Sequence, residues 1–285
     1  MLSKRRSKWL AVPLALTLAL ALSGCSAEQL SRGYLPGTPG ITNHTDTITN
    51  LWNWSWVILL VVGCIAWGLM AYALVRYRRR AGEVGLPPQL RYNMPIETLF
   101  TVVPFIMVIG FFGFTAKTMA SIETPVPNSD VKIEAIGKQW SWDFNYLSQN
   151  VYDTGIQAQP LGNSIDYSKL PVLYLPVNKT VEIDLTSRDV VHSFWVVDFL
   201  YKKDVFPGRT NKIYFTPEKI GTYEGKCAEL CGEFHSMMLF NVKVVSQADY
   251  DAHIAYLAAK GQTGSLGDNL NRDSNLPGDN PSIRG

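Results

Sequence analysis

Cysteine and histidine are scarce in this chain, whose 285 residues include four of each. Charge is scarce as well: charged residues make up 18% of the chain, and the formal net charge is only +2. A balance this small argues against nucleic-acid binding and against a strongly polarised surface. The sequence contains no internal repeat. Metal or redox chemistry must therefore depend on very few side chains.

The first 25 residues predict an export signal of the lipoprotein type. The basic stretch SKRRSK precedes the apolar stretch WLAVPLALTLALAL, and LSGC follows, ending at Cys25. We expect residues 1–24 to be a signal peptide that is cleaved before Cys25, and a lipid to be attached to the Cys25 sulfur. The alternative is an ordinary signal peptide with an incidental cysteine. Without the basic residues of the signal, the mature chain is slightly negative.

Two apolar stretches predict a transmembrane helical hairpin over residues 52–120. The polar stretch 25–51 before it is expected to be an external linker. The first apolar run, 52–75, is long enough to span a bilayer, and the second covers 96–116. The loop between them, about 76–95, contains RYRRR, and the positive-inside rule makes it cytoplasmic. Both flanking segments then lie outside, in agreement with the export signal. A buried hairpin in a soluble protein is the alternative.

Residues 121–245 predict an external β-domain. Short β-prone runs alternate there with turns rich in proline, glycine and asparagine. In VNKTVEIDLTS, Val181 and Ile183 alternate with polar residues, which favours a half-buried strand. Six or more such strands favour a β-sandwich or barrel. Residues 246–260 have one apolar face and predict a short helix. Residues 261–285 are rich in small and polar residues and predict a disordered tail.

The stretch CAELCGEFHSMM places two cysteines beside a histidine and a methionine. Cys227 and Cys231 are four residues apart, His235 is four further on, and Met238 follows by three. A turning loop between two strands could point all four side chains at one centre. His192, in DVVHSFW, offers a second imidazole. The spacing therefore predicts a cluster of sulfur and nitrogen donors.

Three interpretations of this cluster compete. A disulfide between the two loop cysteines is permitted by export, but it leaves the histidines and the methionine unexplained. A structural zinc site accepts two cysteines and two histidines, but it gives Met238 no role. Copper accepts thiolate, imidazole and thioether together, and two bridging thiolates suit two copper ions. The remaining candidates have other expected roles: Cys64 as a small membrane-buried residue, and His44 and His253 as surface histidines.

The run C-A-E-L-C-G-x-x-H-x-x-M, with an H-S-F-W histidine 35 residues upstream of its first cysteine, closely resembles subunit II of haem–copper cytochrome c oxidase. The resemblance extends from about residue 50 to 245 and includes GKQWSW and KKDVFPGR. It implies a two-helix transmembrane hairpin followed by an all-β cupredoxin-like sandwich that holds a dinuclear copper centre, CuA. The ligands it implies are the side chains of His192, Cys227, Cys231, His235 and Met238, and the backbone carbonyl of Glu229.

The resemblance implies further roles for three residues. The Glu229 carboxylate would also face a magnesium or manganese ion shared with subunit I. Trp140, in GKQWSW, would receive the electron from cytochrome c, and the alternative is a core tryptophan. Glu97, in IETLFTVVP, would stand at the cytoplasmic entrance of a proton path into subunit I, and the alternative is an interfacial acid. Two features depart from the family pattern: Ser141 replaces a common tyrosine, and the stretch 145–172 is long and could form an extra lobe.

The resemblance thus implies a subunit of an aa3-type cytochrome c oxidase in a bacterial cell membrane, with the CuA domain on the outer face. It would pass electrons from a c-type cytochrome to haem in subunit I, where oxygen is reduced to water and protons are pumped, and it would assemble with subunits I and III. A lipid anchor is compatible with a membrane-bound donor in a supercomplex with a cytochrome c reductase. The alternatives are a copper-free quinol oxidase subunit II and a copper-delivering lipoprotein. Nitrous-oxide reductase is excluded, because four histidines cannot build its catalytic site.

Overall fold

The computed structural model describes residues 26–86, 89–161, 164–167 and 169–267. The predicted signal peptide, the Cys25 lipidation site and the part of the predicted tail after residue 267 lie outside the described residues. The chain divides into two compact units. One unit contains the residues up to Leu35 and Thr49–Met107, and the other contains Pro36–Ile48 and the chain from Val108 onward.

Two long apolar helices match the predicted membrane hairpin in number and order. Helix α3 (Thr45–Arg76) has 32 residues and α4 (Met94–Glu123) has 30, with mean hydropathies of 2.4 and 2.2 in their most apolar windows. The residues of those windows are not buried within the protein. At about 1.5 Å per residue, each helix exceeds the roughly 30 Å hydrocarbon core of a bilayer. Both helices extend beyond the predicted apolar runs, and a short helix, α2 (Ala27–Ser31), precedes them.

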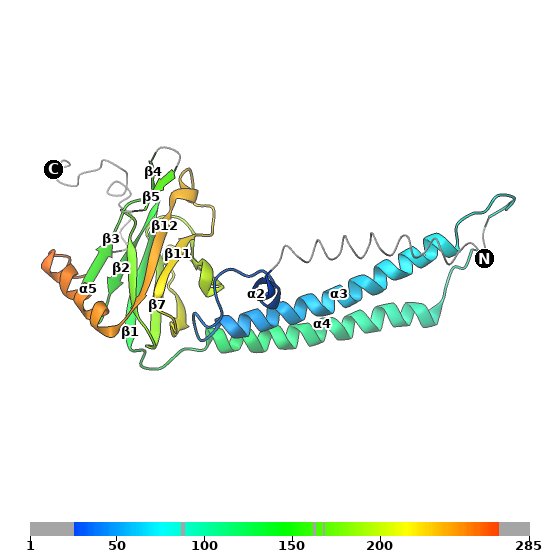
Figure 1. Ribbon diagram of the computed structural model, residues 1–285, viewed down its shortest axis with the longest axis horizontal. Coiled ribbons are helices and arrows are strands. Elements are labelled where there is room, and N and C mark those ends of the chain that lie inside the picture. The colour runs from blue at the N-terminus through cyan, green and yellow to red at the C-terminus, as the bar shows by residue number, and fades with distance from the viewer. Residues whose placement is uncertain (1–25, 87–88, 162–163, 168, 268–285) are drawn as a thin grey trace. The chain divides into compact units, whose positions relative to one another are not determined.

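The second unit contains two five-stranded sheets, which confirms the predicted sandwich (Figure 1). Among the strand pairs of the described chain, two are parallel: β1 (Val131–Lys138) with β7 (Val181–Ser187), and β6 (Val172–Pro176) with β12 (Leu239–Val245). Helix α5 (Gln247–Ala259) follows the last strand, close to its predicted position. The first sheet has the order β10 (Asn211–Phe215), β7 (Val181–Ser187), β1 (Val131–Lys138), β2 (Ser141–Tyr146), β3 (Val151–Thr154). The second has the order β6 (Val172–Pro176), β12 (Leu239–Val245), β11 (Gly221–Cys227), β8 (His192–Val196), β9 (Tyr201–Val205), and β4 (Gln159–Leu161) pairs with β5 (Ser164–Asp166) in a separate hairpin.

An aromatic cluster fills the core between the sheets. The alternate apolar residues of β7 are fully buried, as the pattern VNKTVEIDLTS predicts. The Trp142 ring lies 5.5 Å from Phe194 and 5.5 Å from Phe240, centroid to centroid, and Phe194 stacks on Phe240 at 4.9 Å. Such aromatic pairs contribute about 0.5–1.5 kcal/mol each beyond the area they bury. Because Phe194 belongs to β8, which begins with His192, this packing holds one end of the candidate site.

The predicted external linker is partly packed onto the second unit. Ile41 is buried, and the backbone N–H of Asn43 donates to the carbonyl of Thr216 at 3.1 Å. The expectation of a surface position for His44 is wrong, because its ring is half-buried with Nε2 3.0 Å from the carbonyl of Tyr214. This segment lies along the end of β10 and covers backbone groups that would otherwise face solvent.

The first residues of the predicted tail are also ordered. Residues 262–266 follow the edge of the first sheet, where the Tyr152 N–H donates to the Gln262 carbonyl at 3.1 Å. Farther on, the side-chain amide of Asn145 donates to the carbonyl of Leu266 at 2.8 Å. These contacts satisfy part of the edge of β3. The expectation of disorder therefore fails for this part of 261–285.

His253 is a second histidine that does not lie free at the surface. From α5 it stacks on Tyr174 of β6, with ring centroids 3.6 Å apart and planes 12° from parallel. Burial, together with the charges of Lys243 and Lys260, lowers the pKa of the imidazole to about 4. The ring therefore stays neutral over most of the pH range in which an exposed histidine titrates.

Acidification from neutral pH to about pH 4 is expected to destabilise the second unit through His253. In that interval the unfolded chain binds a proton at this ring, with an ordinary pKa of about 6.5, whereas the folded chain does not. The free energy of unfolding therefore falls as the pH falls. Because the ring is partly in water, we expect a loss of about 1–2 kcal/mol rather than the full linkage value. His253→Gln should flatten the pH dependence of the thermal midpoint, and an unchanged slope would contradict this assignment.

Candidate metal centre

Strands β8 and β11 bring the predicted ligands together. His192 is the first residue of β8, Cys227 is the last of β11, and the two strands pair with Cys227 opposite Phe194. The chain then forms a loop with a 3₁₀ turn at His235–Met237 before β12 begins. The backbone N–H of Cys227 donates to the carbonyl of Met238 at 3.0 Å, which closes the loop at its base. Strand pairing thus fixes both ends of the ligand-bearing loop.

The five predicted side-chain ligands converge on one place. The sulfurs of Cys227 and Cys231 lie 3.8 Å apart. His192 Nδ1 is 3.8 Å from the Cys227 sulfur, and His235 Nδ1 is 3.5 Å from the Cys231 sulfur. Met238 Sδ lies 3.8 Å from the Cys231 sulfur. An imidazole therefore flanks each thiol, and the thioether of Met238 lies beside the thiol of Cys231.

Burial and hydrogen bonding shift the acidity of the two thiols in opposite directions. His192, both cysteines and Met238 are buried, and His235 is partly exposed. The hydrogen bond between the two sulfurs, with support from His192, lowers the pKa of the Cys227 thiol. The pKa of Cys231 is raised, because the Cys227 sulfur lies beside it and burial disfavours a second negative charge. Cys227 is thus the more acidic of the two thiols, and a metal that binds both sulfurs must displace the protons that the pair holds.

Asp189 holds the far side of the His192 ring, and the sequence analysis missed it. Its Oδ1 lies 2.8 Å from His192 Nε2, and its side chain is almost fully buried. A carboxylate on the second nitrogen fixes the tautomer and the orientation of a ligand histidine, so that Nδ1 points to the sulfurs. The spacing D-V-V-H could have suggested this partner, because an acid three residues before a ligand histidine can reach its ring.

The donor set fits copper better than zinc or a disulfide. Thiolate, imidazole and thioether are the combination that copper accepts. The fully buried Met238, with its sulfur beside that of Cys231, has no part in a disulfide and is a poor ligand for zinc. His192, Cys227 and Cys231 have donor atoms within 4.8 Å of one another, close enough to hold a metal ion together.

Comparisons with known proteins show the family of this chain. The sequence profile described as "Cytochrome C oxidase subunit II, periplasmic domain" matches residues 131–245. A "Probable cytochrome c oxidase subunit 2" of Streptomyces avermitilis is 43% identical in an alignment 290 positions long, gaps included, that covers 91% of this chain and 89% of that protein. The chain belongs to the cytochrome c oxidase subunit 2 family. The "Cytochrome c oxidase subunit 2" of Corynebacterium diphtheriae is 30% identical in an alignment 302 positions long that covers 83% of this chain and 81% of that protein. The crystal structure of the periplasmic domain of subunit II of cytochrome oxidase (CoxB) of Bradyrhizobium japonicum is 31% identical, covers 48% of this chain and 99% of its own, and has a TM-score of 0.43.

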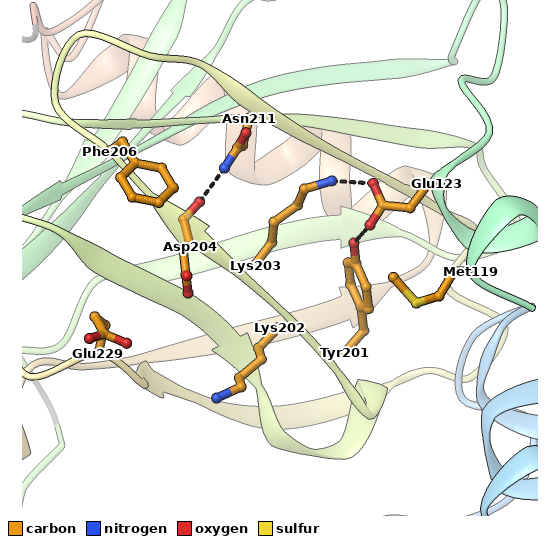
Figure 2. A pocket seen from close by; sticks show the side chains of 9 residues that line it. All are labelled: Met119, Glu123, Tyr201, Lys202, Lys203, Asp204, Phe206, Asn211 and Glu229. Atoms are coloured by element: carbon orange, nitrogen blue, oxygen red, sulfur yellow. Dashed lines mark hydrogen bonds and ion pairs between the residues drawn. The ribbon is translucent and has the colours of Figure 1, made fainter. Parts of the chain in front are cut away.

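In this member of the subunit 2 family, Glu229 has two distinct surroundings. Its carbonyl oxygen lies 3.2 Å from the Cys227 sulfur, whereas its exposed side chain lines a cleft of about 410 Å³. Figure 2 shows Glu229 and Asp204 toward one end of this cleft and Glu123 at the other. The remaining lining residues are Met119, Tyr201, Lys202, Lys203, Phe206 and Asn211. Backbone and carboxylate of Glu229 can therefore act on different neighbours.

Trp140 lies in the turn between β1 and β2, beside the ligand loop. Its indole is half-buried. It meets Phe234 edge-on, with centroids 4.9 Å apart and planes at 77°. The stretch 145–172 also reaches the loop, because the backbone N–H of Ala158 donates to the carbonyl of Met237 at 2.9 Å. Part of this stretch thus packs beside the candidate metal centre.

Glu97 caps the start of α4. Its Oε1 accepts the backbone N–H of Asn93 at 2.9 Å, while Asn93 Oδ1 accepts that of Ile96 at 3.4 Å. The two contacts are reciprocal as in a capping box, with Glu97 one position beyond the usual one, and they satisfy backbone N–H groups at the helix N-terminus. Glu97 therefore has a structural role of its own, and any part in proton transfer has to be tested separately from it.

Proposed function

We propose that this chain is the electron-accepting subunit of an aa3-type cytochrome c oxidase. It takes electrons from a c-type cytochrome and passes them to haem in subunit I, where oxygen is reduced to water and protons are pumped. The observation that carries the proposal is the convergence of two thiols, two imidazoles, a thioether and a carbonyl oxygen at one buried place, in a chain of this family. A quinol oxidase subunit II would have no use for this set.

We propose that two copper ions are held by the side chains of His192, Cys227, Cys231, His235 and Met238 and by the carbonyl of Glu229. Bound copper supplies reversible one-electron chemistry with small changes in bond length. The chain contributes rigidity: strand pairing fixes the loop ends, Asp189 orients one imidazole, and the aromatic cluster packs behind β8. A site held this firmly needs little rearrangement when its charge changes.

Metal content and spectroscopy test the proposal directly. The full-length chain is purified in detergent, loaded with copper and examined for copper per chain and by EPR. We expect two coppers and a mixed-valence signal in which the unpaired electron is shared equally by both. A single copper with a mononuclear signal, or preferential binding of zinc, would contradict a dinuclear centre. Co-purification with a haem-bearing large subunit separates an oxidase subunit from a copper-delivering lipoprotein.

Trp140 is proposed as the residue through which the electron arrives. Trp140→Phe keeps the packing against Phe234 but removes the indole. We expect electron uptake from a reduced c-type cytochrome to slow about tenfold or more in the assembled oxidase, a change equal to about 1.4 kcal/mol or more in activation free energy. Copper content and internal transfer to haem should not change. Stopped-flow absorbance measures both steps, and an unaltered uptake rate would rule out this role.

The Glu229 carboxylate is proposed to bind a magnesium or manganese ion shared with subunit I. Its exposed position in a cleft that also contains Asp204 supports this, because hard divalent cations prefer oxygen ligands. Oxidase produced in manganese-rich medium should show a bound Mn²⁺ signal in EPR, and Glu229→Gln should reduce it while the copper signal remains. Retention of bound manganese in the variant would contradict the assignment.

Glu97 is proposed to stand at the entrance of a proton path. Glu97→Gln preserves the size of the side chain and an oxygen that can accept the Asn93 N–H, but removes the titratable group. We expect oxygen consumption to fall about tenfold or more, because proton delivery then limits turnover and a positioned proton-transfer group typically contributes about 10²–10⁴-fold. Asn93→Ala is the matched control: it removes the cap and keeps the carboxylate. Equal losses in both variants would mean that only the helix cap matters.

The proposed partners are subunits I and III, a c-type cytochrome and membrane lipid. The proposed location is the cell membrane of a bacterium, with two spans and the CuA domain on the outer face, which the two helices of membrane length support. A lipid on Cys25, detected by mass spectrometry of the mature N-terminus, would be a third membrane attachment beside the two helices. A membrane-bound donor in a supercomplex with a cytochrome c reductase would appear as co-migration of both enzymes in a mild detergent.

A further inference from the structure

One residue, Gln139, joins the turn that carries Trp140 to both sides of the metal centre. Its backbone N–H donates to Asp189 Oδ2 at 2.8 Å, and Asp189 Oδ1 lies 2.8 Å from the ring of His192. Its side-chain Nε2 donates to the backbone carbonyl of Cys231 at 2.7 Å. Gln139 is therefore linked to the ring of His192 through the Asp189 carboxylate, and to Cys231 through the backbone carbonyl of that cysteine.

The turn also lies directly on the ligand loop. Gly232, which follows Cys231, has a φ of +127°, a region that favours glycine. A Cβ at this position would lie 3.2 Å from Trp140 Nε1 and 3.2 Å from Gln139 Nε2. No side chain therefore separates the indole from the backbone of the loop. The close approach of the Trp140 indole to the loop backbone depends on Gly232 and on the contacts that hold the turn between β1 and β2 in place.

The indole has no polar anchor of its own. Trp140 Nε1 is buried and has no hydrogen-bond partner among the described residues. Edge-on packing with Phe234 holds one side of the ring, but a packing contact is not directional in the way a hydrogen bond is. Both residues that flank the tryptophan in the chain make directional contacts: Gln139 bonds to Asp189 and Cys231, and the Ser141 hydroxyl donates to the carbonyl of Gly155 at 3.0 Å. Of the two, Gln139 is the one that ties the turn to the metal centre.

We propose that Gln139 is a positioning residue for electron uptake: its two hydrogen bonds fix Trp140 on the backbone at Gly232. This inference rests on the proposed role of Trp140. In the step concerned, one electron leaves the reduced haem iron of a c-type cytochrome and arrives at the oxidised copper centre. No covalent bond forms or breaks, and Gln139 neither gains nor loses a proton. Because the electron must pass from the indole to the metal centre, its rate depends on how closely the turn holds the ring against the ligand loop, and Gln139 supplies the directional contacts that hold the turn there.

The test uses the assembled, purified oxidase and a reduced soluble c-type cytochrome as the donor. Gln139→Met has a side chain of similar length without a donor, and Gln139→Asn keeps the amide but is one methylene too short to reach Cys231. We expect both variants to take up electrons about tenfold more slowly in stopped flow. Copper content, the EPR signal and the reduction potential should equal those of the unaltered enzyme. Gln247→Met, on the exposed first turn of α5, is the matched control.

Two results would overturn the inference. One is an unchanged uptake rate in both Gln139 variants. The other is a loss of copper or an altered EPR signal, because Gln139 would then act on the metal centre itself and not on the position of the indole. Trp140→Phe, measured in parallel, separates this from the proposed function. If Trp140→Phe is slow and the Gln139 variants are not, only the positioning role fails; if Trp140→Phe is not slow, the role of the tryptophan fails first.

Discussion

Replacing Cys231 with serine is expected to abolish oxygen consumption by the assembled oxidase, with a loss of about a hundredfold or more. The Cys231 sulfur lies within 3.8 Å of the sulfurs of Cys227 and Met238 and 3.5 Å from the ring of His235. A serine hydroxyl is a hard ligand and stays protonated at neutral pH, so it cannot replace a bridging thiolate. We expect reduced copper content and no mixed-valence EPR signal, alongside the loss of activity in an oxygen electrode.

Cys64→Ser provides the matched control for this prediction. Cys64 is exposed on α3 and is a free thiol, like the two cysteines of the loop. The same chemical change there should leave copper content, spectrum and oxygen consumption at their original values. If Cys231→Ser retained the mixed-valence signal, the second thiol would not be a copper ligand, and the dinuclear proposal would have to be abandoned.

The ligand set can be predicted from the sequence because the chemistry demands particular residue types at short spacing. Cys227, Cys231, His235 and Met238 fall within one loop, and the structure brings them together with His192. The sandwich is predictable for a similar reason, since burial of one face of a strand imposes a period of two on its residues. Both predictions rest on patterns that are local in the chain.

The supporting contacts could not be predicted in this way. Gln139 meets Asp189 and Cys231, which lie 50 and 92 residues away, and nothing near Gln139 in the sequence marks either partner. His44 lies in a polar segment and His253 on a short helix, and the burial of each ring is decided by the strand that it packs against. Tertiary context overrides weak local preference in each case.

A buried cluster of charged residues could not be predicted from the sequence either. Lys138, Asp143 and Arg188 would be placed at the surface by composition alone, because such residues are rarely fully buried. The structure leaves their side chains 5%, 0% and 8% exposed. They bracket the two turns that carry Gln139 and Asp189, so the cluster supports the surroundings of the metal centre as well as the core.

Asp143→Ala is accordingly expected to cost about 3–5 kcal/mol of stability, because it leaves two buried cations without their shared partner. The Asp143 carboxylate accepts from Lys138 Nζ at 2.7 Å and from the hydroxyl of Thr154, and its Oδ2 forms an ion pair with Arg188 at 2.9 Å. Burial already lowers the pKa of Lys138, and Asp143 is the first group that opposes this shift. Without the carboxylate, water must enter or a cation must leave the core. The thermal midpoint of the full chain in detergent should fall by about 10 °C.

The matched control is Asp130→Ala, which removes an exposed carboxylate that lies 4.0 Å from Lys179 and accepts from Thr180, and it should lower the thermal midpoint much less than Asp143→Ala does. A second comparison isolates the cause. Replacing Lys138, Asp143 and Arg188 together by methionine, leucine and methionine removes all three charges, and buried ion clusters exchanged for apolar residues are often close to neutral in stability. A triple variant more stable than Asp143→Ala would show that the loss of stability comes from the two buried cations that are left without a partner. If Asp143→Ala were no worse than Asp130→Ala, the cluster would contribute nothing to the fold, and its support of the turns beside the metal centre would have to come from packing alone.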